Sequence, residues 1–208
     1  MVTYEQRLNQ NRRWARLEGS MHFEKESAVY QALSKVVKRL TELDVPYAVA
    51  GGMALFEHGF RRFTEDVDIL VTREDLVKIH QHLEGLGYVA PFAGSKNLRD
   101  AELGVRIEFL VAGEYPGDGK PKPIAFPDPA EASVELGGIR YLSLHRLIEL
   151  KLASGMTNVH RHQDIVDVER LIATLKLGLD LADDLNPFVR DKYRELWTLL
   201  AENPEKPE

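Results

Sequence analysis

The sequence contains no cysteine among its 208 residues, which excludes disulfide bonds and thiolate metal sites. It contains no run of about 18 apolar residues, so we predict no membrane-spanning helix and no membrane partner. It also lacks a basic surplus, because 27 Lys and Arg are outnumbered by 33 Asp and Glu and the formal net charge is −6 at pH 7. Proteins that coat nucleic acid usually carry a basic surplus, so this total disfavours such a partner, although it leaves room for a local basic groove.

The composition that remains is that of a folded globular protein. Hydrophobic residues make up 44% of the chain and charged residues 29%, a balance typical of globular rather than disordered chains. The length suits one domain, or one domain with a helical annex. The first twenty residues hold arginines but no apolar stretch, so no signal peptide is expected. Together with the absence of cysteine, this favours a cytoplasmic location.

Strands and helices are mixed up to about residue 142, and only helices are predicted after it. Strands are predicted within residues 47–50, 66–71, 88–91, 98–112 and 132–142. Helices are predicted at residues 27–43, 53–59, 72–87, 143–153, 157–177 and after Pro187. The chain is therefore predicted to be an α+β protein with a small mixed β-sheet. We expect an N-terminal arm (1–20), a core (21–142) and a helical domain (143–208).

Two aspartates stand one residue apart in the predicted strand "DVDILV". Successive side chains of a strand alternate between its faces, so Asp66 and Asp68 project together while Val67 and Ile69 face the core. Two ionised carboxylates this close repel, and each raises the pKa of the other unless a cation lies between them. Mg²⁺ is a natural partner, because it prefers oxygen ligands. The alternative is that the aspartates only form a solvated face or protect a sheet edge.

Two neighbouring features favour a phosphate ligand beside these aspartates. Gly51 and Gly52 occupy a strand-to-helix junction, where glycine allows close approach of a ligand and free N–H groups attract phosphate. Their alternative role is a tight turn. The stretch "RRFT" adds cations and a hydroxyl through Arg62 and Thr64, and its alternative role is a salt bridge to Asp66 or Glu65.

A third carboxylate lies on the predicted strand "VRIEFLVA". Glu108 stands among apolar residues, where a buried charge is costly without a partner. If this strand pairs beside "DVDIL", three carboxylates converge. Three carboxylates, two metal ions and a phosphate-binding glycine turn are the apparatus for in-line attack on a nucleoside triphosphate (NTP).

These motifs resemble those of the nucleotidyltransferase superfamily that includes DNA polymerase β. The R-x-T-x-D-x-D stretch, from Arg62 to Asp68, is most similar to bacterial AbiE-type nucleotidyltransferase toxins. The resemblance continues in "LIELK", which ends at Lys151, and in a later helix that carries Asp164, so it covers roughly residues 45–175. The chain departs from the toxin pattern in having Gly-Gly where Gly-Ser is usual, a slightly longer spacer, and Glu108 where the superfamily often has Asp.

The resemblance implies transfer of a nucleoside monophosphate from an NTP to an acceptor hydroxyl, with release of pyrophosphate. It implies that Asp66, Asp68 and Glu108 bind two Mg²⁺ ions, and that Glu108 also helps to deprotonate the acceptor. Gly51, Gly52, Arg62 and Thr64 would then bind the nucleotide. Lys151 would contact phosphate, with Asp164 in support. The alternative for Lys151 is a structural pair with Asp164.

By the same resemblance, the chain is expected to be the toxin of a toxin–antitoxin pair that acts on tRNA or other RNA and binds a cognate antitoxin. Alternative acceptors are a small antibiotic-type molecule or a protein. An alternative from another class is a non-catalytic nucleotide- or partner-binding protein on the same scaffold. The arginine-rich stretch "NRRWAR" (residues 11–16) is either a docked helix or a mobile arm, and it suits either RNA or the protein's own surface.

Overall fold

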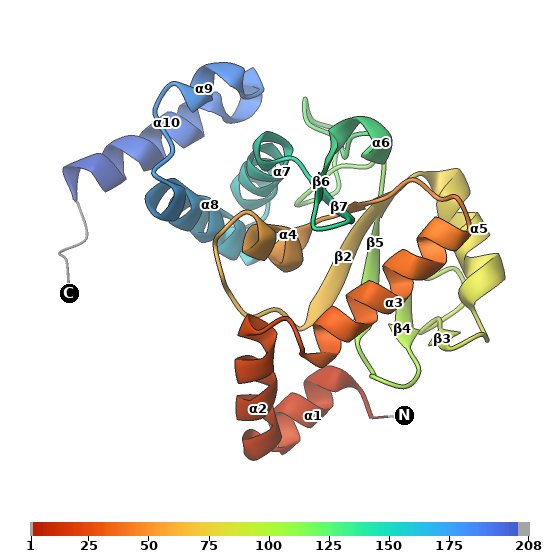
Figure 1. Ribbon diagram of the computed structural model, residues 1–208. Helices are drawn as coiled ribbons and strands as arrows, with labels where there is room; N and C mark the ends of the chain where they lie inside the picture. The colour runs from red at the N-terminus through yellow and green to blue at the C-terminus, as the bar shows by residue number, and fades with distance from the viewer. Residues whose placement is uncertain (1, 204–208) are drawn as a thin grey trace.

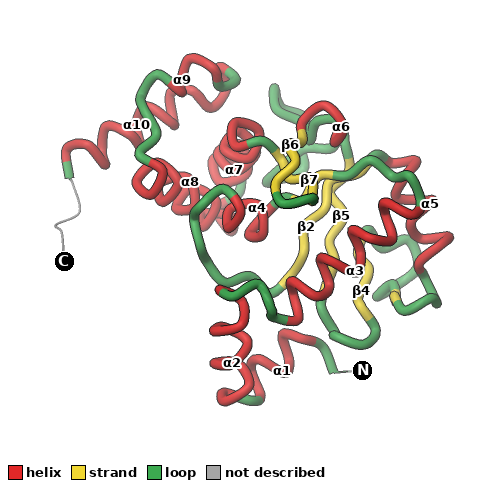
Figure 2. Tube along the Cα trace, viewed as in Figure 1, coloured by secondary structure: helices red, strands yellow, loops and turns green. Residues whose placement is uncertain are grey.

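The computed structural model describes residues 2–203, which form a seven-stranded mixed β-sheet surrounded by helices (Figures 1 and 2). The strands are β1 Ala48–Val49, β2 Asp66–Val71, β3 Tyr88–Val89, β4 Asn97–Asp100, β5 Arg106–Val111, β6 Ser133–Leu136 and β7 Ile139–Leu142. Their spatial order is β3-β4-β5-β2-β1-β7-β6. Pairs β2/β5 and β1/β7 are parallel and the other pairs are antiparallel. The predicted α+β fold with a mixed sheet is confirmed.

The central strands β2 and β5 separate core side chains from polar ones by alternation. Val67 and Ile69 of β2 are fully buried, as is Ile107 of β5. Asp66 and Asp68 alternate with them and remain half-buried. The polar face of this strand pair is therefore free to form a site, while its apolar face fixes the strands in the core.

Two amphipathic helices pack on the sheet beside these strands. Helix α3 (Ala28–Glu42) contacts β2 and crosses the sheet diagonally in Figure 1, and α5 (Arg73–Leu83) contacts β5. Both helices begin at the residues that the sequence predicts, because the Ser27 hydroxyl accepts a hydrogen bond from the backbone of Tyr30 and the Thr72 hydroxyl accepts one from that of Asp75.

Two short helices differ from their predicted bounds. Helix α4 (Gly51–Glu57), predicted to begin at residue 53, already begins at the glycine pair, so these glycines form its first turn. No helix is predicted between residues 113 and 130, yet the short helix α6 (Pro129–Ala132) begins within this segment. Asp128 accepts a hydrogen bond from the backbone N–H of Ala130 at its start, and proline is favoured in a first turn.

The N-terminal stretch is a docked pair of helices, α1 (Tyr4–Gln10) and α2 (Arg12–Phe23), which lies at the bottom of Figure 1. The buried Tyr4 hydroxyl donates to Glu18 Oε2 at 3.0 Å, and the same oxygen accepts the backbone N–H of Ala28 at 3.0 Å. Buried hydrogen bonds of this kind hold the pair against α3. The described residues of this stretch are therefore docked on the fold, in line with the first of the two interpretations.

The C-terminal part is helical, as predicted. Its elements are α7 Leu144–Thr157, the 3₁₀ turn η1 Val159–Arg161, α8 His162–Leu175, α9 Leu181–Asp184 and α10 Pro187–Glu202. The prediction of one helix over residues 157–177 is wrong at its beginning, because Asn158 is extended and its side chain accepts the backbone N–H of His160, which starts η1. Over residues 2–203, no helix combines the length and apolar character that crossing a bilayer requires.

Candidate active site

Three carboxylates from the two central strands meet on the polar face of the sheet. In the parallel register Asp68 of β2 lies beside Glu108 of β5, and Asp66 precedes Asp68 on the same face. One oxygen of each carboxylate lies within 4.8 Å of the others. We refer to Asp66, Asp68 and Glu108 as the carboxylate trio. The convergence expected from the sequence is therefore observed.

The electrostatics of the trio favour a bound cation. The pKa of Asp68 is raised to about 7, first by burial and then by the carboxylates of Asp66 and Glu108, while Lys151 and Arg106 act in the opposite direction. A divalent cation among these oxygens would relieve the repulsion. The donor set, three carboxylates with no nitrogen or sulfur, fits Mg²⁺.

Gly51 brings backbone directly against the trio. Its φ is +57°, which favours glycine, and a Cβ built there would lie 1.8 Å from Asp68 Oδ2. The backbone N–H of Ala50 also donates to the Asp68 carbonyl at 2.8 Å. Gly52 has a different role. A Cβ added there would lie 2.7 Å from Thr64 Cβ, so the absence of a side chain leaves room for Thr64. Gly52 itself does not line the cleft.

Thr64 and Arg106 both engage the Asp66 carboxylate. The buried Thr64 hydroxyl donates to Asp66 Oδ1 at 3.0 Å. Arg106 Nη2 contacts Asp66 Oδ2 and lies 3.5 Å from Glu108 Oε2. Arg106 was not predicted as a site residue, although its position two residues before Glu108 on the same strand places it on this face.

The opposite wall carries a network of buried charges from α7 and α8. Lys151 Nζ donates to Asp164 Oδ1 at 2.8 Å and to Asp167 Oδ2 at 2.7 Å. Ser154 Oγ donates to Asp164 Oδ2 at 2.7 Å. Arg62 reaches across to this wall, with Nε 3.2 Å from Asp167 Oδ1, so its ion pair is with neither Asp66 nor Glu65. Asp167 was not predicted as a site residue, although it directly follows the apolar pair Ile165–Val166 and lies three positions after Asp164 in α8.

A cleft of about 750 Å³ separates the trio from this network. Its lining also includes an apolar group, Leu110, Pro116, Phe126, Leu142, Leu147 and Leu150. His160 and Arg161 of η1 lie in the lining as well. The size and the mixture of apolar and charged groups suit a nucleotide-sized ligand. Of the predicted site residues, only Gly52 lies outside this lining.

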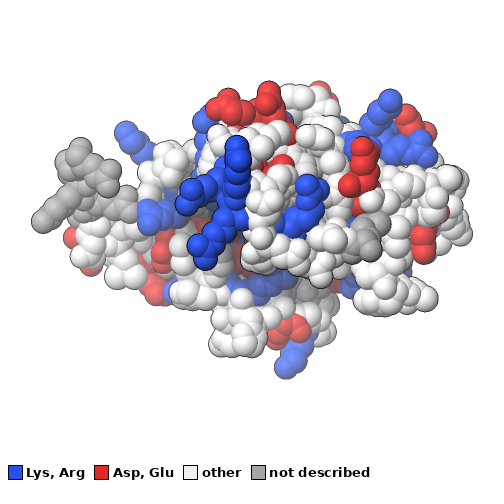
Figure 3. Space-filling model, turned by 90° about the horizontal axis from the view of Figure 1, so that it is seen from below, with Lys and Arg blue, Asp and Glu red and all other residues white. Residues whose placement is uncertain are grey.

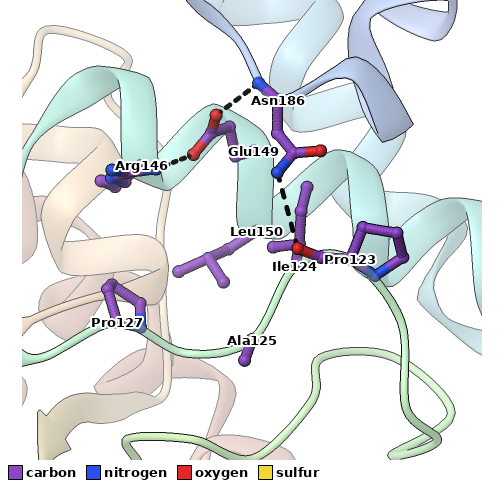
Figure 4. Close-up of a pocket in the computed structure, with 8 residues that line it drawn as sticks. All are labelled: Pro123, Ile124, Ala125, Pro127, Arg146, Glu149, Leu150 and Asn186. Atoms are coloured by element: carbon purple, nitrogen blue, oxygen red, sulfur yellow. Dashed lines mark hydrogen bonds and ion pairs between the residues drawn. The ribbon is translucent and has the colours of Figure 1, made fainter.

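A second, small cavity of about 80 Å³ lies where the 113–128 segment meets α7 and the start of α10 (Figure 4). Glu149, which is 4% exposed, accepts the backbone N–H of Asn186 at 2.6 Å and a hydrogen bond from Arg146 at 2.7 Å. Asn186 also donates to the Pro123 carbonyl. These contacts fasten a loop and two helices together, and none of the trio lies among them.

No protein-family model matches the chain, and no curated protein matches it in sequence. Solved structures do match. The crystal structure of ANT(2″)-Ia in complex with adenylyl-2″-tobramycin superposes with a TM-score of 0.53 at 15% identity, covering 79% of this chain and 96% of that one.

Two further structures align with lower scores. The solution structure of the antibiotic-resistance factor ANT(2″)-Ia aligns with a TM-score of 0.49 at 14% identity, covering 82% of this chain and 93% of that one. An antigenic nucleotidyltransferase-like protein from Paracoccidioides brasiliensis aligns with a TM-score of 0.47 at 16% identity, covering 84% of this chain and 88% of that one. The first likeness shows the fold of this chain: it is the fold of the nucleotidyltransferase ANT(2″)-Ia.

Proposed function

We propose that the protein is a Mg²⁺-dependent nucleotidyltransferase. In the proposed reaction an acceptor hydroxyl attacks the α-phosphorus of an NTP, an O–P bond forms, the bond to the β-phosphate oxygen breaks, and pyrophosphate leaves with the electron pair. The observation that carries the proposal is the convergence of Asp66, Asp68 and Glu108 in one cleft of a nucleotidyltransferase fold.

The trio would hold two Mg²⁺ ions. When bound, these ions supply positive charge that orients the attacking and leaving oxygens and offsets charge developing on them. Thr64 fixes the orientation of Asp66 through its hydrogen bond. The proposed proton acceptor for the acceptor hydroxyl is the carboxylate of Glu108.

The remaining site residues are proposed to hold the triphosphate. Gly51 lines the cleft without a side chain and allows phosphate to approach the backbone, and Gly52 supports it by packing against Thr64. Lys151 uses two of its three N–H groups on Asp164 and Asp167, so one donor remains for a phosphate oxygen. In this proposal the structural pairing and the phosphate contact of Lys151 are compatible.

The catalytic proposal is tested by nucleotide transfer with Asp66→Asn and Asp68→Asn. Purified protein is incubated with each α-labelled NTP, Mg²⁺ and total cellular RNA, and label on macromolecules and small molecules is measured. We expect transfer by the native sequence and a loss of at least about a hundredfold in each variant. Glu135→Gln, which changes an exposed strand carboxylate on β6, is the control. NTP binding without any transfer would instead support the non-catalytic alternative.

For the acceptor, we propose RNA, including tRNA. Arg12, Arg13 and Arg16 of α2 are exposed, and none forms an ion pair within residues 2–203. Figure 3, which views the molecule from the side of α1 and α2, shows a group of basic side chains near the middle of this face. The other end of α2 packs against the loop that carries Arg62, because the buried His22 Nε2 lies 3.2 Å from the backbone carbonyl of Arg62. The exposed arginines suit contacts with a phosphate backbone.

We also propose that the protein is the toxin of a toxin–antitoxin pair and that a cognate antitoxin binds it. The R-x-T-x-D-x-D stretch supports this proposal. Induced expression of the native sequence should arrest growth of a bacterial host, while Asp68→Asn should not. Co-expression of an adjacent small reading frame should restore growth. Arrest by both forms would contradict a catalytic toxin.

A second candidate acceptor is a small cationic molecule with several hydroxyls. The compact cleft favours it, because five carboxylates line the cavity: Glu65, Asp66, Asp68, Glu108 and Asp164. The fold is also shared with ANT(2″)-Ia, whose crystal structure contains adenylyl-2″-tobramycin. Mass spectrometry of aminoglycosides after incubation with ATP and Mg²⁺ separates the two acceptors, since a nucleotide adduct on the drug and none on RNA would favour this candidate.

A further inference from the structure

Arg106 is a cation built into the polar face that carries the trio. The parallel register places Arg106 beside Asp66 and Glu108 beside Asp68. Because residues two apart on a strand share a face, all four side chains project to the same side of the sheet. The strand pairing therefore fixes the side of the sheet on which Arg106 lies.

The contacts of Arg106 are those of a counter-ion. Its Nη2 contacts one oxygen of Asp66, and the Thr64 hydroxyl donates to the other, so donors from the protein engage both oxygens of this carboxylate. The same Nη2 lies 3.5 Å from Glu108 Oε2. A divalent ion ligated by Asp66 and Glu108 would lie close to the guanidinium, and like charges at that distance repel.

The guanidinium of Arg106 is also able to move away from the trio. Its side chain is 39% exposed and lines the cleft. Arg106 Nε is buried and has no hydrogen-bond partner among the described residues, so the observed position leaves one donor unsatisfied. A rotation into the cleft would give that donor access to water or to an anionic ligand.

We propose that Arg106 is the internal counter-ion of the metal-free site, a positioning residue that holds Asp66 and Glu108 until a divalent ion displaces it. This inference rests on the proposed metal site. A divalent ion must therefore compete with the arginine for the carboxylates. In the absence of nucleotide, it binds more weakly than it would to the same trio without the arginine. The displaced guanidinium then faces the cleft, where the triphosphate carries negative charge.

The test measures Mn²⁺ binding to the full chain without nucleotide, by electron paramagnetic resonance of free Mn²⁺. Arg106→Gln removes the charge and keeps polar atoms, Arg106→Lys keeps the charge, and Arg73→Gln, which breaks an exposed ion pair with Glu114, is the control. We expect Arg106→Gln to lower the Kd for Mn²⁺ about three- to tenfold, the Lys variant to remain near the native value, and the control to be unchanged.

A second readout is the melting temperature of the metal-free protein. Arg106→Gln should lower the melting temperature, because the trio loses its counter-ion. Saturating Mn²⁺ should raise the melting temperature by more in this variant than in the native sequence. A Kd for Mn²⁺ that is unchanged or higher in Arg106→Gln would overturn the counter-ion proposal while leaving the metal site in place. Equal Mn²⁺ binding by the native sequence and Asp66→Asn would overturn the proposed metal site as well.

Discussion

Gly51 shows how closely one residue can control the site. Its positive φ and the 1.8 Å approach of a Cβ to Asp68 Oδ2 leave no room for alanine. We expect Gly51→Ala to cost about 1–2 kcal/mol of stability from backbone strain and to displace the Asp68 carboxylate. Urea unfolding and the Kd for Mn²⁺ measure the two effects.

Gly113 supplies the matched control for this change. Its φ is +84°, but apart from its two neighbours in the chain no described residue would lie within 4 Å of an added Cβ. Gly113→Ala should therefore lose stability through backbone strain but bind Mn²⁺ as tightly as the native sequence, whereas Gly51→Ala should bind Mn²⁺ more weakly. If both variants bind Mn²⁺ equally well, the close approach of Gly51 to Asp68 does not matter for the site.

Asp68 makes the stability of the metal-free protein depend on pH. Its folded pKa of about 7 lies above the ordinary value of 3.8, so the folded state binds the proton more tightly than the unfolded state. Stability is therefore lost as the pH rises between these two values. We expect the melting temperature to fall from pH 5 to pH 7.5 in the native sequence and to fall less in Asp68→Asn. An identical fall in both would contradict this assignment.

Glu149 acts at the scale of the elements, because its carboxylate joins α7 to the first turn of α10. Glu149→Ala leaves the half-buried Asn186 N–H without its partner, and we expect a loss of about 1–2 kcal/mol in the free energy of unfolding. Arg146→Gln removes only the more exposed partner and should cost less than about 1 kcal/mol. Urea unfolding measures both, and equal losses would contradict the buried hydrogen bond as the cause.

The elements that the sequence predicts well are those set by local signals. The alternation in "DVDILV" predicts both β2 and the shared face of Asp66 and Asp68, and Thr72 predicts the start of α5. The break between the helices predicted at 143–153 and 157–177 lies a few residues later than predicted, at Asn158, because its position depends on a side-chain cap.

Contacts between distant segments are where the sequence is least informative. The ion pair of Arg62 with Asp167 joins the loop before β2 to α8, and no spacing along the chain indicates it. The meeting of Glu108 with the aspartates was predicted only on the condition that its strand lies beside "DVDIL". The parallel β2/β5 pairing supplies that condition.

At the scale of the whole molecule, charge is distributed unevenly. The net charge is −6, yet α2 presents Arg12, Arg13 and Arg16 to solvent. If RNA binds here, changing all three to Gln should weaken RNA binding and reduce the slope of log K against log salt by roughly 2, since each contact with a single strand contributes about 0.7. Fluorescence anisotropy with a labelled tRNA over a salt series measures the slope.

A control with the same change in total charge replaces exposed lysines elsewhere, Lys38, Lys120 and Lys176, by Gln. It should leave the slope nearly unchanged. An equal reduction in both triple variants would mean that RNA responds to the net charge of the molecule and not to this surface.

The register of β2 and β5 determines both the active site and the hydrophobic core, and this limits how the chain can evolve. Sliding β5 by one residue against β2 would bring Phe109 into the cleft and Glu108 into the hydrophobic interior, because neighbouring side chains exchange faces. Such a slip would unfold the domain before it could yield an inactive but intact descendant. Lineages that abandon catalysis while keeping this architecture are therefore expected to do so through point replacement at the three acidic positions.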